Sequence, residues 1–258
     1  MKLAVLSDVH GNMAALEAVL AEIDHEAPDL VVNLGDLVSG ALEPGATATR
    51  LRAADHVVVR GNHERQVLEG SDLPSDLRAT AELTDEDLSW LASLPERVEP
   101  APGVVAVHGS PRDDLEYLLE TVDRRGARPA SAAEVVERLG DDSHASLVLC
   151  GHSHLARVRR IEGGPLVVNP GSVGWPAYRE TQPFPHVMEA GSPHARYALV
   201  EKRDGAWTAT PRQVVYDWEA AARLAELHGR PDAAFSLRTG RAPAIFDAIK
   251  TTLTPPTT

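Results

Sequence analysis

Short apolar stretches alternate with helical spacing in the first part of the chain. Residues 3–6 (Leu-Ala-Val-Leu) are typical of a buried strand. Apolar residues then recur at the i, i+3, i+4, i+7 positions of an amphipathic helix, at Leu16, Val19, Leu20 and Ile23. Pro28 predicts that this helix ends near Ala27. Further strands are expected at 30–34 and 57–59, with a helix at 47–54 between them, and this order predicts parallel strands with right-handed crossovers.

The pattern becomes richer in strands toward the C-terminus. The middle of the chain predicts helices from Thr84 and over 131–139, and strands at 104–107 and 147–149. Later segments with turn signals between them predict strands at 157–161, 166–168, 197–200 and 206–210, before a helix at 217–227.

Two segments lack a clear pattern. Residues 176–193 are rich in proline and show little periodicity, so we expect a long loop there. No repeat, low-complexity tract or linker divides the chain, so we expect one domain over residues 1–240. A loosely packed tail is expected over 241–258, which ends in Thr-Pro-Pro-Thr-Thr.

Composition and charge narrow the class of protein. Apolar residues make up 43% of the chain, which is enough for a core and too much for a disordered protein. The net charge of −13 argues against a nucleic-acid partner, because phosphate backbones are bound by clustered Lys and Arg. A small anionic substrate stays open if metal ions supply positive charge.

Cysteine usage and apolar run lengths indicate the compartment. Cys150 is the single cysteine, so it forms no internal disulfide, and its place in an apolar run is typical of an inert thiol. Ser7 and Asp8 interrupt the first apolar run, which is too short for a signal-peptide core. No run approaches the ~20 residues of a membrane helix. We therefore expect a cytoplasmic protein without a membrane partner.

Polar side chains gather where five of the predicted strands end. Because ligands bind outside the carboxyl ends of strands in open α/β sheets, we expect these side chains to share one edge. They are Asp8, His10, Asp36, Asn62, His63, His108, His152 and His154. Imidazole and carboxylate ligands without thiolate favour a catalytic divalent metal over calcium or a structural zinc site. So many side chains exceed the needs of one ion and suit two ions about 3.5–4 Å apart that share a carboxylate.

Each of these short motifs is weak by itself. An Asp and a His after a strand are most often a turn and a cap, and Gly35-Asp36 is ordinary turn chemistry. His108 alone would suit a hydrogen-bonded core histidine. The prediction of a metal site depends on the combination of five motifs, each at a strand end.

The five motifs together resemble those of a known family. In chain order they are Asp-x-His, Gly-Asp, Gly-Asn-His-Glu, Val-His-Gly and Gly-His-x-His, and they resemble the calcineurin-like metallophosphoesterase superfamily. Residues 169–174 (Asn-Pro-Gly-Ser-Val-Gly) resemble a further loop of its small bacterial phosphodiesterase branch. The resemblance spans residues 1–240 and implies an α/β fold of two facing mixed β-sheets flanked by helices, a four-layer αββα sandwich, with a dinuclear site at the sheet edge.

The resemblance also implies roles for single residues. The first ion would be held by Asp8, His10, Asp36 and His154, and the second by Asp36, Asn62, His108 and His152. His63 matches the catalytic histidine that binds no metal, and a phosphate-facing loop would be lined or supported by Asn169, Gly171 and Ser172. The two divalent ions are expected to be manganese, with iron, zinc, nickel, cobalt and magnesium as alternatives.

One motif departs from the pattern of the superfamily's Ser/Thr protein phosphatases. Those proteins continue Gly-Asp-x-x-Asp-Arg-Gly, whereas here Ser39 and Gly40 stand in place of the second Asp and the Arg. The difference argues against a protein phosphatase. It also leaves open which carboxylate, if any, orients His63.

Further residues have two interpretations each. Trp175, Tyr178, Arg179 and His186 could contact substrate or pack within the expected loop. The basic cluster of Arg157, Arg159 and Arg160 suits a solvated strand edge better than a phosphate-binding patch.

The expected function is hydrolysis of small phosphodiesters, with nucleotides as one candidate substrate. A metal-bridging hydroxide would attack phosphorus, while His63 protonates the leaving oxygen or binds a phosphate oxygen. A phosphomonoesterase and a nuclease of the same superfamily are the alternatives, and a non-catalytic scaffold is the least favoured. The sequence predicts neither the substrate nor the oligomeric state.

Overall fold

The first and last strands of the fold meet in one sheet. The structure is a computed structural model that describes residues 1–244. In the first sheet β1 pairs in parallel with β2, and β2 pairs in parallel with β3, while β13 lies antiparallel on the other side of β1. The sheet has the order β14 (Ala206–Val214), β13 (Ala195–Arg203), β1 (Lys2–Leu6), β2 (Leu30–Asn33), β3 (Val57–Val58).

The second sheet is also mixed. Its three central strands, β5, β8 and β10, are parallel, and both edge strands are antiparallel to their neighbours. The order is β4 (Arg97–Ala101), β5 (Val104–Val107), β8 (Leu147–Leu149), β10 (Leu166–Asn169), β9 (Arg157–Arg160). The parallel order that the sequence predicts for the first three strands is confirmed.

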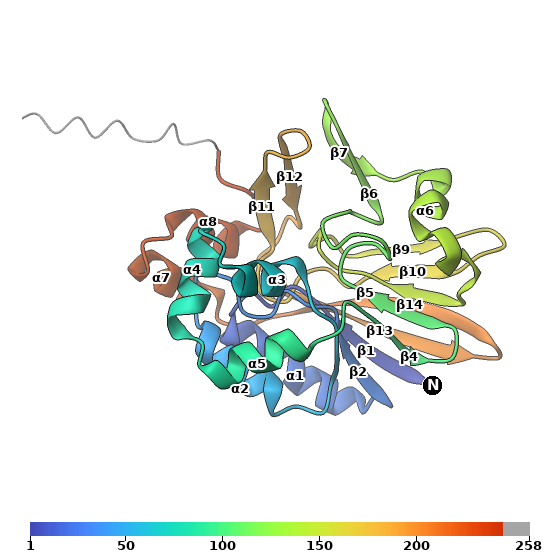
Figure 1. Ribbon diagram of the computed structural model, residues 1–258, viewed down its shortest axis with the longest axis horizontal. Coiled ribbons are helices and arrows are strands. Elements are labelled where there is room, and N and C mark those ends of the chain that lie inside the picture. The colour runs from blue at the N-terminus through green and yellow to red at the C-terminus, as the bar shows by residue number, and fades with distance from the viewer. Residues whose placement is uncertain (245–258) are drawn as a thin grey trace, which may run out of the picture.

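Three layers of apolar side chains hold the sheets and helices together. Leu3 and Val5 of the first sheet pack against Ala106 and Leu149 of the second in a core between the two sheets. The outer face of the first sheet packs against α1 (Met13–Glu26), α2 (Pro44–Arg52), α5 (Asp85–Ser93) and α7 (Trp218–Leu227). The outer face of the second packs against α6 (Ala132–Leu139), which precedes a 3-10 turn, Gly140–His144. Figure 1 shows α6 apart from the other helices. The expected four-layer fold is confirmed.

Helix ends follow the local signals of the sequence. Asn12 caps α1 by accepting a hydrogen bond from the Ala15 amide, and Ala27 ends the helix in the left-handed conformation. Thr84 and Ser131 begin α5 and α6 with capping boxes, and Asp217 caps α7. The helices α5, α6 and α7 therefore begin within one residue of their predicted starts, and α1 ends next to Ala27 as predicted.

The expected long loop over 176–193 is wrong. This segment contains an antiparallel hairpin of β11 (Ala177–Glu180) and β12 (His186–Glu189). Its prolines stand at 176, 183, 185 and 193, outside the paired residues, so they remove no hydrogen bond from the ladder. A second hairpin of β6 (Glu120–Asp123) and β7 (Gly126–Pro129) stands beside β12 (Figure 1).

Three short helices were not predicted from the sequence. They are α3 (Asn62–Glu69), α4 (Pro74–Glu82) and α8 (Pro231–Thr239). Most of the expected tail, residues 245–258, lies outside the described residues. Within residues 1–244, no helix combines the length and apolar character that crossing a membrane needs.

Candidate metal centre

The loops that follow the strands hold candidate ligands in an unusual backbone conformation. Five of them have positive φ angles: Asp8 (57°), His10 (49°), Asp36 (55°), His152 (66°) and His154 (59°). Only two other non-glycine residues within 1–244 share this property, Ala27 and Asp204. Each such residue costs about 1–3 kcal/mol unless its surroundings compensate, and such strain is concentrated at functional sites. The backbone therefore adopts a disfavoured conformation at each of these residues, and this conformation turns their side chains toward a common point.

Glycine is needed where two of these loops touch. A Cβ atom at Gly61 would overlap Asp36 Oδ1, and one at Gly151 would overlap Ser7 Oγ. These two positions therefore require glycine so that the strand ends of the two sheets can approach the site closely.

The first group of candidate ligands joins Asp8, His10, Asp36 and His154, all buried. One ligand atom of each lies within 4.8 Å of the others. His10 Nε2 is 3.1 Å from His154 Nε2, and His154 Nε2 is 3.4 Å from Asp8 Oδ1. The arrangement places nitrogen and oxygen donors around one point.

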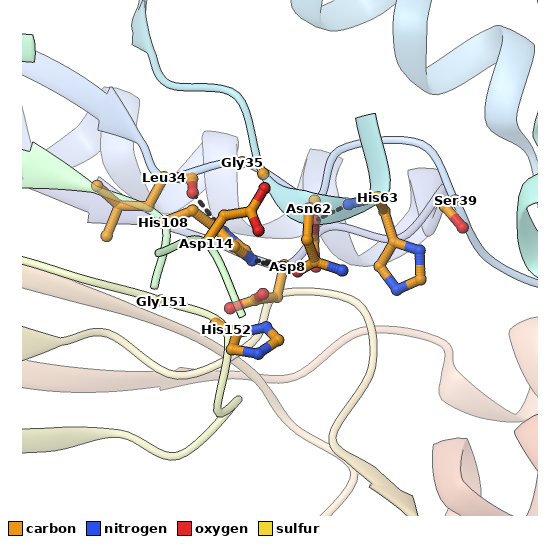
Figure 2. A network of polar contacts seen from close by, with 12 residues as sticks. Asp8, Leu34, Gly35, Ser39, Asn62, His63, His108, Asp114, Gly151 and His152 are labelled. Carbon is orange, nitrogen blue, oxygen red and sulfur yellow. Dashed lines mark hydrogen bonds and ion pairs between the residues drawn. The ribbon is translucent and has the colours of Figure 1, made fainter. Parts of the chain in front are cut away.

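The second group shares a carboxylate with the first. Asp36, His108 and His152 also bring ligand atoms within 4.8 Å of one another. His108 Nε2 lies 3.2 Å from Asp36 Oδ2 and 3.0 Å from Asn62 Oδ1. Figure 2 shows Asn62, His108 and His152 converging beside Asp8. Asp36 is the member common to both groups.

Backbone carbonyls determine which nitrogen each histidine turns inward. The Nδ1 atoms of His10, His108 and His154 lie 2.6–2.7 Å from the carbonyls of Ser39, Leu34 and Trp175, respectively. Because a carbonyl only accepts, each Nδ1 carries a proton and each Nε2 is the nitrogen turned toward the site. His152 is reversed, since its Nε2 donates to the Leu115 carbonyl at 3.1 Å and its Nδ1 stays free.

Candidate ligand atoms of the first group are left without a satisfying partner among residues 1–244. Both carboxylate oxygens of Asp8 are buried without a hydrogen bond from the described residues. The Nε2 lone pairs of His10 and His154 face each other. An unsatisfied buried acceptor costs about 1–3 kcal/mol, which a cation between these atoms would remove. Nitrogen and oxygen donors without thiolate fit divalent transition metals.

Burial and neighbouring charges set the protonation of the histidines. Burial, together with His154, lowers the pKa of His10 to about 3, and burial with His108 lowers the pKa of His152 to about 3. Both imidazoles are therefore neutral, as a metal ligand must be. At His108 burial acts in the same direction, but Asp36 outweighs it and raises the pKa to about 10.

His63 lies beside this centre and is held by a carboxylate that the sequence analysis missed. Its Nδ1 donates to Asp76 Oδ1 of α4 at 2.8 Å. Asp76 is fully buried and also accepts hydrogen bonds from the hydroxyls of Ser39 and Ser71. Burial opposes protonation of His63, but Asp36 and the hydrogen bond to Asp76 raise its pKa to about 9. Ser39, in the loop where the protein phosphatases carry Asp, thus binds a carboxylate from α4.

Comparison with known proteins identifies the family. Residues 1–189 match the family described as calcineurin-like phosphoesterase superfamily domain. The chain belongs to this superfamily. It is a metallophosphoesterase, and the family and the two residue groups together support divalent metal ions at the site.

Relatives of this metallophosphoesterase span most of its length. It is 30% identical over 201 residues to the uncharacterized protein MJ0912 of Methanocaldococcus jannaschii, which covers 67% of this chain and 76% of that protein. A metallophosphoesterase structure from Sphaerobacter thermophilus matches with a TM-score of 0.69 and 25% identity, covering 92% of this chain and 98% of that one. The hypothetical protein PH1004 of Pyrococcus horikoshii OT3 shares the fold with a TM-score of 0.70 and 19% identity, covering 94% and 99%.

Glu64 is a second residue whose role the sequence analysis missed, although it lies in the Gly-Asn-His-Glu motif. Its buried carboxylate accepts hydrogen bonds from the amides of Asp36 (2.8 Å), Leu37 (2.7 Å) and Gly61 (2.9 Å). It thereby joins the loops after β2 and β3 and places Asp36 beside Asn62.

The site lies on the floor of a cleft of about 1030 Å³. Three sequence candidates for substrate contact line this cleft, namely Trp175 and the β11 residues Tyr178 and Arg179. Further wall residues come from the segment 115–122, from α4 and from α8. The walls are therefore built mostly from elements that carry none of the candidate ligands.

The other four candidates, Asn169, Gly171, Ser172 and His186, do not line the cleft. Asn169 donates to the Gly151 carbonyl at 2.7 Å and accepts from the Gly171 amide at 2.8 Å. The hydroxyl of Ser172 donates to the Asp8 carbonyl at 2.8 Å. Asn169 and Ser172 therefore support the backbone of the loops that carry the candidate ligands, and they do not face the cleft.

The basic cluster on β9 does not act as a unit. Arg157 donates to Glu120 at 2.7 Å, whereas Arg159 donates to the Ala130 carbonyl and Arg160 to the Trp207 carbonyl. Alternation along the strand turns neighbouring side chains to opposite faces. The arrangement offers no shared phosphate-binding patch.

Proposed function

We propose that this metallophosphoesterase hydrolyses small phosphodiesters at a dinuclear centre. The observation that carries the proposal is the pair of ligand groups joined by Asp36. Asp8, His10, Asp36 and His154 would hold one ion, and Asp36, Asn62, His108 and His152 the other. We propose manganese as the metal. When bound, two divalent ions supply positive charge that neutralises the phosphate and makes water a stronger acid.

His63 is proposed as the general acid for the leaving group. Its Nδ1 is engaged by Asp76, so Nε2 is the nitrogen available to the cleft that His63 lines. A proton held at Nε2 can pass to the leaving oxygen as the ester bond breaks. A positioned general acid contributes about 10²–10⁴-fold to the rate.

The cleft walls favour a small ester over a nucleic acid. The walls of the cleft carry more carboxylates than guanidinium groups. The guanidinium groups are those of Arg138, Arg179 and Arg230, and the carboxylates are those of Glu116, Glu120, Glu180 and Asp232. Nucleic-acid backbones need an excess of cations that this surface does not provide. The volume of the cleft leaves room for an ester group on each side of the phosphate, which favours a diester.

The proposal is tested with metal-free protein prepared by chelation. Turnover of bis(p-nitrophenyl) phosphate and of p-nitrophenyl phosphate is measured while Mn²⁺ is added back and bound metal is counted. We expect no activity without metal, full activity at two ions per chain, and a higher kcat/KM for the diester. Activity that survives chelation would refute the metal centre, full activity with one ion would refute the dinuclear site, and a higher kcat/KM for the monoester would refute the substrate class.

A further inference from the structure

His152 is the least firmly anchored candidate ligand. The other three histidines make contacts of 2.6–2.7 Å with carbonyls, whereas His152 donates to the Leu115 carbonyl at 3.1 Å. Leu115 lies outside regular secondary structure and is 49% exposed. This single contact leaves the imidazole free to tilt, because it does not hold the plane of the ring.

An aromatic ring supplies the missing constraint. Tyr117 stacks on the His152 imidazole with ring centroids 4.7 Å apart and planes 19° from parallel. The stacked ring limits rotation of His152 about its side-chain bonds. Tyr117 can do so only if its own position is held.

Tyr117 is held by two residues of the β11–β12 hairpin. Its hydroxyl lies 3.0 Å from His186 Nε2 and 3.0 Å from the Tyr178 hydroxyl. The Nδ1 of His186 donates to the Phe184 carbonyl at 2.7 Å, so its Nε2 is the acceptor for the Tyr117 proton. The Tyr178 hydroxyl also lies 3.1 Å from the His152 carbonyl, so its single proton serves both Tyr117 and the backbone of the ligand.

We propose that Tyr117, Tyr178 and His186 form a clamp that positions His152 and thereby sets the affinity of the second ion. The inference rests on the proposed dinuclear function. Both hydroxyls are occupied within the clamp, and one face of Tyr117 is covered by His152, so these groups act on the ligand rather than on substrate. The hairpin thus couples the wall of the cleft to one half of the metal centre.

The clamp is tested by titrating metal-free protein with Mn²⁺, using calorimetry for the affinity of each ion and electron paramagnetic resonance for the coupled pair. Tyr117→Leu removes the stacked ring, whereas Tyr117→Phe and Tyr178→Phe keep the rings and remove only the hydroxyls. Tyr197→Phe is the matched control, because Tyr197 is a buried tyrosine whose hydroxyl faces Glu22, outside the site.

We expect Tyr117→Leu to weaken the second ion by about 10- to 100-fold, the usual effect of losing a group that orients a ligand. The coupled signal should disappear at ion concentrations that saturate the wild type, while the first ion binds normally and shows that the protein is folded. The two Phe variants should weaken the second ion less, and Tyr197→Phe should leave it unchanged.

Three results would count against the clamp in distinguishable ways. Normal binding of both ions by Tyr117→Leu would show that stacking does not position His152. Parallel weakening of both ions would point to general destabilisation and would likewise overturn the inference. A wild type that binds fewer than two ions would overturn the proposed dinuclear function itself.

Discussion

Every candidate ligand on the floor of the cleft lies within a few residues of a strand end, whereas the walls come from hairpins and short helices that lie elsewhere in the chain. On the floor, positive φ angles and backbone carbonyls orient each side chain locally. In the walls, side chains act through contacts across the fold, such as Asp76 with His63. The difference implies that floor residues supply the candidate metal ligands, whereas wall residues act on the site indirectly, by positioning those ligands and His63.

The largest effect is expected from the shared carboxylate. Asp36→Ala should release both ions and reduce turnover to the background rate, because Asp36 belongs to both ligand groups. Metal content per chain and diesterase activity are the measurements. Asp36→Asn is the matched control, since it keeps an acceptor for the His63 amide but loses the charge. Two ions retained in Asp36→Ala would contradict the shared role.

Substitution of His63 tests whether this residue binds metal or acts only in catalysis. His63→Ala should retain both ions and lower kcat by about 10²–10⁴-fold, because a general acid is lost without a metal ligand. Metal analysis and steady-state kinetics on an aryl phosphodiester check both parts. Full activity in this variant would show that His63 has no part in the mechanism. Loss of metal would show that His63 is needed for metal binding.

Substitution of Asp76 tests whether a residue of the cleft wall positions His63. Asp76→Asn should keep both ions and KM but lower kcat by at least about 10-fold, up to the loss in His63→Ala, because the fixed tautomer of His63 is lost. The pH profile of kcat should also change, since the group that orients His63 no longer carries a charge. Ser71→Ala is the control, because it removes one hydrogen bond to Asp76 and leaves the contact with His63. An unchanged kcat would show that Asp76 is only structural.

The smallest effect is expected at the exposed rim. Arg179 lines the cleft, and its guanidinium donates to the Pro243 carbonyl rather than to a carboxylate among the described residues. Arg179→Ala should raise KM by about 2- to 5-fold with kcat unchanged, since exposed charge interactions contribute less than about 1 kcal/mol. Arg160→Ala, on the β9 strand, is the control. A large fall in kcat would instead show that Arg179 acts in the chemical step.

The sequence by itself determined the strand ends and the chemistry that follows them. Apolar runs, capping residues and prolines act over a few residues, so the positions of Asp8, Asp36 and His108 after their strands could be predicted. The same short-range signals predicted the end of α1 and the starts of α5, α6 and α7.

Only the tertiary structure decided how the walls meet the floor. Asp76 contacts His63 because α4 packs beside α3, and Tyr178 reaches Tyr117 across 61 residues because a hairpin forms where proline suggested a loop. Such contacts depend on packing between elements that bury little apolar surface of their own. No local pattern encodes them, and they follow only once the two sheets have brought the elements together.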